Sequence, residues 1–124
     1  DNAVLYTDHV LANLIKTLQA RADTVDSAVI FASDHGESLG ENGIFLHGVP
    51  YSIAPDVQTR VPMVMWFSDG FIKSNRLDPA CLAERAKAPA SHDNIFHTIT
   101  GLLDVRTTLH EAAWDLTSSC RPSR

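Results

Sequence analysis

The residues best suited to chemistry form the run Asp34-His35-Gly36, which is separated from the apolar stretch at 28–32 only by Ser33. A carboxylate oxygen and an imidazole nitrogen are both ordinary zinc ligands. Glycine lets the backbone approach a ligand closely because it has no Cβ. Asp34 and His35 are therefore candidate metal ligands. They lie at the transition from a buried apolar stretch to a polar segment.

The Asp-His pair alone carries little information, because the chain contains a second copy at Asp8-His9 and the reverse order at His92-Asp93. Those two pairs fall in or at the start of expected helices, where we interpret them as solvated surface or capping groups. Position is what distinguishes Asp34, and the residues by themselves leave a metal site and a plain polar loop both open.

His47 is a third candidate, twelve residues after His35 and followed by a glycine. It can share the pocket of His35 only if the intervening loop folds back; otherwise it is a surface histidine. We expect His97, on the last helix, to be a packing residue. The spacing of Gly36, Gly40 and Gly43 matches neither the Rossmann nor the Walker pattern, so these glycines are expected to form turns.

The elements that must position these residues follow from apolar periodicity. The expected order is a helix from Asn2 to about Arg21, a strand at 28–32, a loop at 33–55, a strand at 61–67, turns at 68–80, a short helix at 81–88 and a helix from Ser91 or His92. The segment beyond Arg106 has weak periodicity and is expected to be loosely held.

Two groups of apolar residues indicate what these elements bury. An apolar face on the first helix, which we expect to pack on another element, consists of Leu11, Leu14, Ile15 and Leu18. Core positions are expected in the second strand at Met63, Met65, Trp66 and Phe67. Buried strands that alternate with helices predict an α/β fold with a parallel or mixed sheet, in which ligands bind beyond the carboxyl ends of strands.

Composition narrows the class of protein. The 124 residues carry a net charge of −5, opposite to the basic surface that a phosphate backbone requires, so nucleic acid is an unexpected partner. The longest apolar run, Val61–Phe67, is far shorter than the roughly 20 residues that cross a bilayer. Length alone predicts one compact domain.

The string SDHGESLGENG at 33–43, followed by Leu46-His47-Gly48 and Pro50-Tyr51, resembles the signature of the phosphoethanolamine transferases that modify lipid A. These enzymes include the mobile colistin-resistance proteins. Further matches in the family's order lie at 53–56, 61–63, 91–94 and 96–97. The resemblance thus covers nearly the whole chain.

This resemblance implies that residues 1–124 are the C-terminal portion of a periplasmic catalytic domain with the alkaline phosphatase and sulfatase-like α/β fold. It implies zinc as cofactor, with Asp34 and His35 as ligands and His47 near the transferred group. The donor would be phosphatidylethanolamine and the acceptor a lipid A phosphate, at the bacterial inner membrane, and the product would confer colistin resistance. The family's threonine nucleophile is expected upstream of Asp1, so the chain alone should be inactive.

Several alternatives stay open. The parent could be another alkaline phosphatase superfamily enzyme, such as a sulfatase, a phosphodiesterase or a transferase to a different glycan, or the chain could be a non-catalytic binding module. Cys81 and Cys120 lack CxxC spacing; in a periplasmic protein they could pair with each other or with cysteines elsewhere. A sheet separated from its neighbouring strands should also favour self-association.

Overall fold

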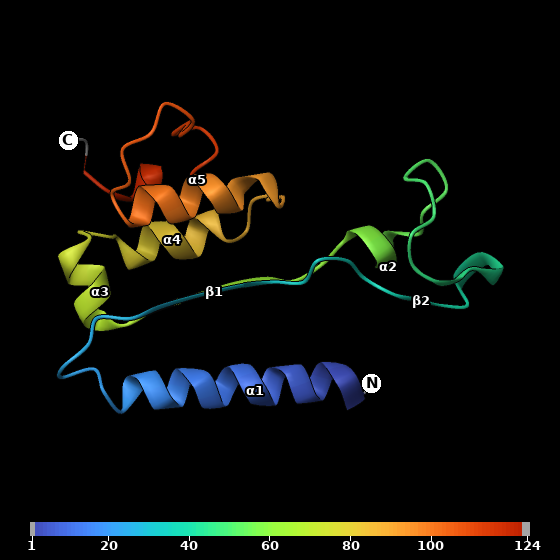
Figure 1. Cartoon of the computed structure of the whole chain (residues 1–124), viewed down its shortest axis with the longest axis horizontal. Coiled ribbons are helices and arrows are strands. Elements are labelled where there is room, and N and C mark those ends of the chain that lie inside the picture. The colour runs from blue at the N-terminus through green and yellow to red at the C-terminus, as the bar shows by residue number, and fades with distance from the viewer. Residues whose placement is uncertain (1, 123–124) are drawn as a thin grey trace. The chain divides into compact units, whose positions relative to one another are not determined.

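A computed structural model describes residues 2–122 of the chain. The chain divides into two units, one formed by residues 29–66 and the other by residues 1–28 together with 67–124. Figure 1 labels those helices and strands for which there is room, and each unit is described by itself below. Helices and strands alternate along the chain, which confirms the predicted α/β class.

The first unit contains the two predicted strands, β1 (Ala28–Ala32) and β4 (Met63–Phe67), which pair with each other. The Ser33 N–H donates to the Pro62 carbonyl at 3.2 Å, and the Ser68 N–H donates to the Ser27 carbonyl at 2.9 Å. The end of β1 therefore lies beside the start of β4, so this pair is antiparallel, as a mixed sheet allows.

Between these strands, the segment expected to be a loop contains further structure. A two-residue hairpin pairs β2 (Ser38–Leu39) with β3 (Phe45–Leu46), and a 3₁₀ turn, η1 (Glu41–Gly43), joins them. A short helix, α2 (Asp56–Thr59), follows. The turn uses left-handed backbone at Asn42 (φ 55°) and Gly43 (φ 73°), a conformation that glycine and asparagine adopt at low cost.

The second unit is helical. Its elements are α1 (Asn2–Gln19), α3 (Asp69–Ser74), α4 (Pro79–Arg85), α5 (Asp93–Leu102) and η2 (Ser118–Cys120). The turn-rich prediction for 68–80 missed α3, which begins because the Ser68 hydroxyl accepts from the Phe71 N–H. Helix α4 starts two residues before the predicted position, where Asp78 caps the amides of Ala80 and Cys81.

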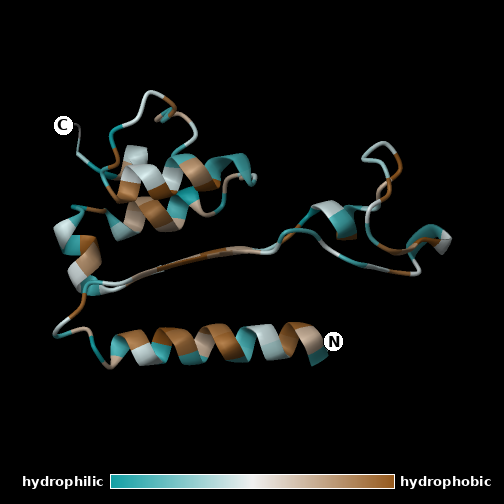
Figure 2. Ribbon diagram, in the orientation of Figure 1, coloured by the Kyte–Doolittle hydropathy of each residue, from teal (hydrophilic) through white to brown (hydrophobic). Residues whose placement is uncertain are grey.

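Helix α1 ends two residues before the predicted end and buries less than expected. None of its described residues is buried; Val4, Leu5 and Tyr6 are 65–70% exposed, and Figure 2 shows hydrophobic residues along the helix. Within residues 2–122, the predicted apolar face thus has only partial cover. No helix in this range is long and apolar enough to cross a membrane.

The predicted core of the second strand is also less enclosed than expected, because Met63, Met65, Trp66 and Phe67 are all half-buried. The buried apolar side chains of the described residues are Val29, Leu77, Leu102, Leu116 and Cys120. A strand pair covered on both faces would bury the second-strand residues more fully.

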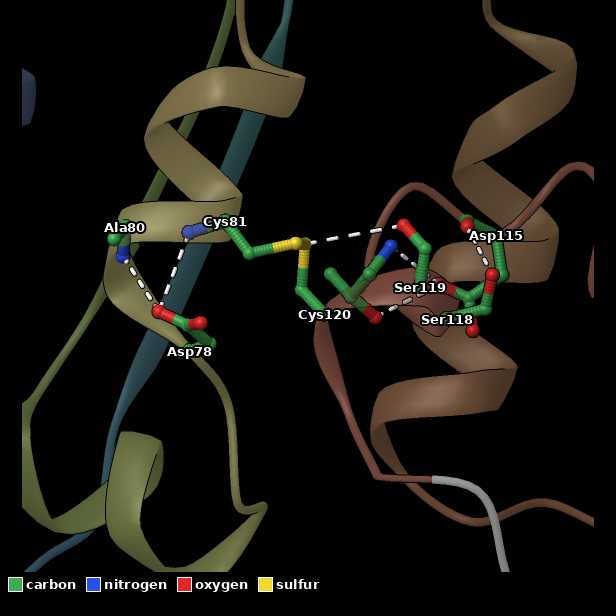
Figure 3. Close-up of a disulfide and its surroundings, with 8 residues drawn as sticks. Asp78, Ala80, Cys81, Asp115, Ser118, Ser119 and Cys120 are labelled. Atoms are coloured by element: carbon green, nitrogen blue, oxygen red, sulfur yellow. Dashed lines mark hydrogen bonds between the residues drawn. A yellow bond between two sulfur atoms is a disulfide. The ribbon is translucent and has the colours of Figure 1, made fainter.

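The end of the C-terminal segment is firmly held, so the expectation of a loose segment beyond Arg106 is wrong for residues 115–121. Cys120 forms a disulfide with Cys81 of α4, with Cα atoms 5.4 Å apart (Figure 3). The Asp115 carboxylate is buried and accepts from the Arg121 guanidinium and from the Thr117 N–H and hydroxyl, both at 2.8 Å. Polar contacts and a covalent bond fix this segment, which is why apolar periodicity did not reveal it.

Candidate metal centre

Asp34, His35 and Gly36 lie where the sequence placed them, immediately after β1. The Ser33 N–H is tied to the Pro62 carbonyl at the end of the strand pair, and the Ser33 hydroxyl donates to the His35 carbonyl at 2.9 Å. The strand therefore anchors the first turn of the loop, and the side chains of Asp34 and His35 extend from a fixed backbone.

The Asp34 carboxylate and the His35 imidazole converge on one point. Asp34 Oδ2 lies 3.7 Å from His35 Nε2. The His35 backbone N–H donates to Asp34 Oδ1 at 3.0 Å; this bond is the main reason that the pKa of Asp34 is lowered from its usual value, and the nearby His35 side chain contributes to the same direction. Asp34 is therefore an anionic oxygen donor at neutral pH.

The tautomer of His35 follows from its other ring nitrogen. Nδ1 lies 2.9 Å from the Gly36 carbonyl oxygen, and since a carbonyl can only accept, Nδ1 carries a proton. In the neutral ring Nε2 then has its lone pair free toward Asp34. A backbone carbonyl that fixes the tautomer in this way is typical of metal-ligating histidines.

The loop does fold back, and His47 lies against His35. The two imidazole rings stack with centroids 3.8 Å apart and an angle of 28° between their planes. His47 Nδ1 donates to Glu37 Oε2 at 2.9 Å. The structure thus brings together Asp34, His35 and His47, the three residues that the sequence singled out.

Glu37 was missed by the sequence reasoning. His35, Glu37 and His47 each offer one ligand atom, and these three atoms lie within 4.8 Å of one another. A signal was present: Glu37 stands two residues after His35, and in extended backbone residues i and i+2 project to the same side.

This donor set fits zinc. Bonds of about 2.0–2.2 Å in a tetrahedral site place ligand atoms about 3.4 Å apart, close to the 3.7 Å between Asp34 and His35. These side chains are 42–89% exposed, so a cation can reach them from solvent. His35, Glu37 and His47 each offer one donor atom, all within 4.8 Å of one another, and Asp34 adds a carboxylate oxygen beside His35.

The other Asp-His pairs behave as expected of surface groups. His9 contacts Asn13 one turn away on exposed α1, and Asp93 is exposed at the start of α5, where it accepts from the Ser91 hydroxyl at 3.3 Å. His97 is a packing residue, as predicted, because its Nδ1 accepts from the Glu111 N–H at 2.9 Å.

Comparison with known proteins shows several extensive similarities. The family model described as Sulfatase matches residues 1–105. The chain is 47% identical over 122 residues to phosphoethanolamine transferase EptA of Salmonella typhimurium, covering 98% of this chain and 22% of that protein. It is 39% identical over 105 residues to phosphatidylethanolamine transferase Mcr-1 of Escherichia coli, covering 85% and 18%.

Solved structures agree with this similarity. The soluble domain of lipooligosaccharide phosphoethanolamine transferase A from Neisseria meningitidis superposes with a TM-score of 0.94 at 44% identity, covering 99% of this chain and 37% of that one. The integral membrane protein of the same name and organism gives a TM-score of 0.93 and covers 99% and 23%. The chain thus spans about a fifth of the length of the curated relatives it matches.

Proposed function

The chain belongs to the sulfatase family, and from this premise we propose that it is the metal-binding, C-terminal portion of a catalytic domain that transfers phosphoethanolamine from phosphatidylethanolamine to a lipid A phosphate. The observation that carries the proposal is the cluster of His35, Glu37 and His47 beside the end of β1, with the Asp34 carboxylate 3.7 Å from His35. The chain that carries this cluster is 47% identical to a protein named phosphoethanolamine transferase and 39% identical to one named phosphatidylethanolamine transferase.

The names of the relatives support both substrates. Mcr-1 is named a phosphatidylethanolamine transferase, which points to the donor lipid. A further Escherichia coli relative, 37% identical over 107 residues, is named Kdo(2)-lipid A phosphoethanolamine 7''-transferase, which points to a lipid A-containing acceptor.

In this proposal Asp34 and His35 hold zinc, and Glu37 lies close enough to be a third ligand. When bound, zinc neutralises charge on phosphoryl oxygens and makes a coordinated hydroxyl a better nucleophile. Asp34 is ready to bind a cation because its pKa is lowered. His35 directs its Nε2 lone pair toward the same point because the Gly36 carbonyl holds the proton on Nδ1.

His47 serves the transferred group. Its Nδ1–H donates to Glu37, which orients the ring. When the ring is protonated, its Nε2–H can donate to a phosphoryl oxygen or to the departing hydroxyl oxygen of the donor. We assign the nucleophile to none of Thr7, Thr17 and Thr24, because they do not match the family's motif.

The proposal also places the parent protein at the bacterial inner membrane with this part in the periplasm. The similarity to a solved integral membrane protein supports it, and the disulfide between Cys81 and Cys120 agrees with an oxidising compartment. Transfer of phosphoethanolamine adds an amine to lipid A, so the modified surface would attract cationic peptides such as colistin less strongly.

The deciding experiment compares Asp34→Asn and His35→Gln with Asp8→Asn and His9→Gln in the full-length protein that carries this chain. The second pair is a matched control, because the same dipeptide there lies on exposed α1. Zinc content is measured by elemental analysis, and transfer to lipid A by mass spectrometry. We expect the first pair to lose zinc and more than about 100-fold in rate, and the control pair to resemble the wild type.

Unchanged zinc content and transfer in the Asp34 and His35 variants would reject the assignment. Hydrolysis of sulfate esters in place of transfer to lipid A would favour a sulfatase, and absence of zinc and of both activities in the wild type would favour a binding module.

A further inference from the structure

The hairpin that carries Glu37 and His47 is too short to hold its own register. Its two strands contain two residues each, paired as Ser38 with Leu46 and Leu39 with Phe45. Isolated two-stranded hairpins are marginally stable even when longer. A one-residue slip would turn every side chain to the opposite face, so a contact from outside the hairpin must fix the pairing.

Gln58 of α2 makes that contact. Its side-chain amide nitrogen donates to the Ser38 hydroxyl at 2.8 Å and to the Leu46 carbonyl at 3.0 Å. Gln58 is only 6% exposed and Ser38 only 2%, so the hydrogen bond to Ser38 is shielded from water and the one to Leu46 is partly buried. Ser38 and Leu46 are register partners, and one amide group therefore holds both strands at the same step of the ladder.

Each residue that Gln58 contacts adjoins a residue of the metal centre. Ser38 follows Glu37 and Leu46 precedes His47. The backbone carbonyl of Gln58 accepts from the Gly36 N–H at 2.9 Å, between His35 and Glu37. Three hydrogen bonds from one residue thus fix the backbone on both sides of the stacked histidines.

We propose that Gln58 is a positioning residue, whose amide sets the register of the hairpin so that Glu37 and His47 lie against His35. The role rests on the metal centre of the proposed function, but it concerns contacts within this chain. It requires an amide, because only a group with two N–H donors can serve a hydroxyl and a carbonyl from one nitrogen. A glutamate at position 58 has the same shape, but its carboxylate has no N–H to donate to the Leu46 carbonyl.

The test uses Gln58→Met, which keeps the length of the side chain and removes the donor, and Gln58→Glu, which keeps its shape. The control is Gln19→Met, at the exposed end of α1. Zinc affinity is measured by competition with a chelator, and the coordination by the visible spectrum of the Co²⁺-substituted full-length protein. We expect about 10- to 100-fold weaker zinc binding and an altered Co²⁺ spectrum in both Gln58 variants, and wild-type behaviour in the control.

A second substitution, Ser38→Ala, keeps the test decisive if Gln58→Met does not fold, because it removes one acceptor and leaves Gln58 in place. We expect a smaller loss of zinc affinity, and where both variants fold their effects should be less than additive in the double variant. Hydrogen exchange of residues 37–47, followed by mass spectrometry, should accelerate in all of these variants except Gln19→Met.

The outcomes separate this inference from the proposed function. Wild-type zinc affinity and Co²⁺ spectrum in folded Gln58→Met and Ser38→Ala would overturn the role of Gln58, whatever the enzyme transfers. Weaker zinc binding in these variants would support it even if the parent protein did not act on lipid A.

Discussion

Replacing Gly36 with alanine should displace His35 and Glu37, the proposed metal ligands on both sides of it. A Cβ built at this position would lie 1.8 Å from the Val57 carbonyl oxygen and 2.8 Å from its carbon. Because that neighbour is backbone, no side chain can rotate away. The loop must therefore move by more than about 1 Å from α2 before the added carbon reaches an ordinary van der Waals contact.

The size of the effect follows from this movement. The movement would break the 2.9 Å hydrogen bond from the Gly36 N–H to the Gln58 carbonyl. Loss of this bond costs about 0.5–1.5 kcal/mol of free energy. Accommodating the extra carbon costs about 1–3 kcal/mol. The sum, about 1.5–4.5 kcal/mol, acts on the segment that holds His35 and Glu37. If most of it opposes metal binding, zinc affinity should fall about 100-fold, since each tenfold change is about 1.4 kcal/mol.

This expectation is tested by measuring zinc affinity in competition with a chelator. The full-length wild-type protein is compared with the variants Gly36→Ala and Gly43→Asn. Gly43 is a suitable control, because no described atom lies within 4 Å of a Cβ there and asparagine tolerates its left-handed φ of 73°. We expect the control to bind zinc as the wild type does. Wild-type affinity in Gly36→Ala would refute the reasoning, because the clash would then have been absorbed without moving the ligands.

Three other results are expected. Reduction of the disulfide, or Cys81→Ala with Cys120→Ala, should lower the free energy of unfolding by about 4 kcal/mol, because the bond closes a loop with a sequence separation of 39; denaturant titration with and without reductant measures this, and a loss below about 1 kcal/mol would contradict it. The folded-state pKa of Glu41 lies below the reference value of 4.5, first because its carboxylate accepts from its own backbone N–H and next because it accepts from the Leu39 N–H at 2.7 Å. The stability it gives is present above that value and lost as the pH falls through the lowered pKa, so the Leu39 amide shift in NMR should titrate below 4.5, and a midpoint at or above 4.5 would be evidence against the contact. The 124-residue chain should self-associate through exposed apolar residues such as Leu5, which is 65% exposed; sedimentation should show oligomers that Leu5→Asp reduces, whereas a monomer at all concentrations would argue against this.

The sequence predicted best where one local signal was sufficient. The apolar run at 28–32 predicted a strand, and Asp34 and His35 marked the polar residues at its end. A continuous apolar run predicts a buried strand even when the strand that pairs with it is unknown. The apolar stripe located α1 for the same reason. The periodicity does not show which element packs on the apolar face of α1, because such packing depends on residues distant in the sequence. The partial exposure of this face could therefore not be predicted.

The hairpin and Glu37 depended on contacts that leave no periodic trace. Strands of two residues are too short for alternation to show, and they are held by Gln58 from twelve residues beyond Leu46. The proposals of zinc and of the two substrates came from the resemblance of the whole string at 33–43 to a known family. Without that string, an Asp-His pair fits a polar loop equally well.

The disulfide between Cys81 and Cys120 also determines what happens when the chain is cut. Much of the segment from Leu103 to Trp114 is exposed, which makes it a natural target for proteases. A cut there lies inside the covalent loop, so both pieces stay attached through the sulfur atoms, and the buried contacts of Asp115 remain in place. The nicked protein would migrate as one species until it is reduced, and the proposed metal centre, which lies within residues 34–47, would keep an intact backbone.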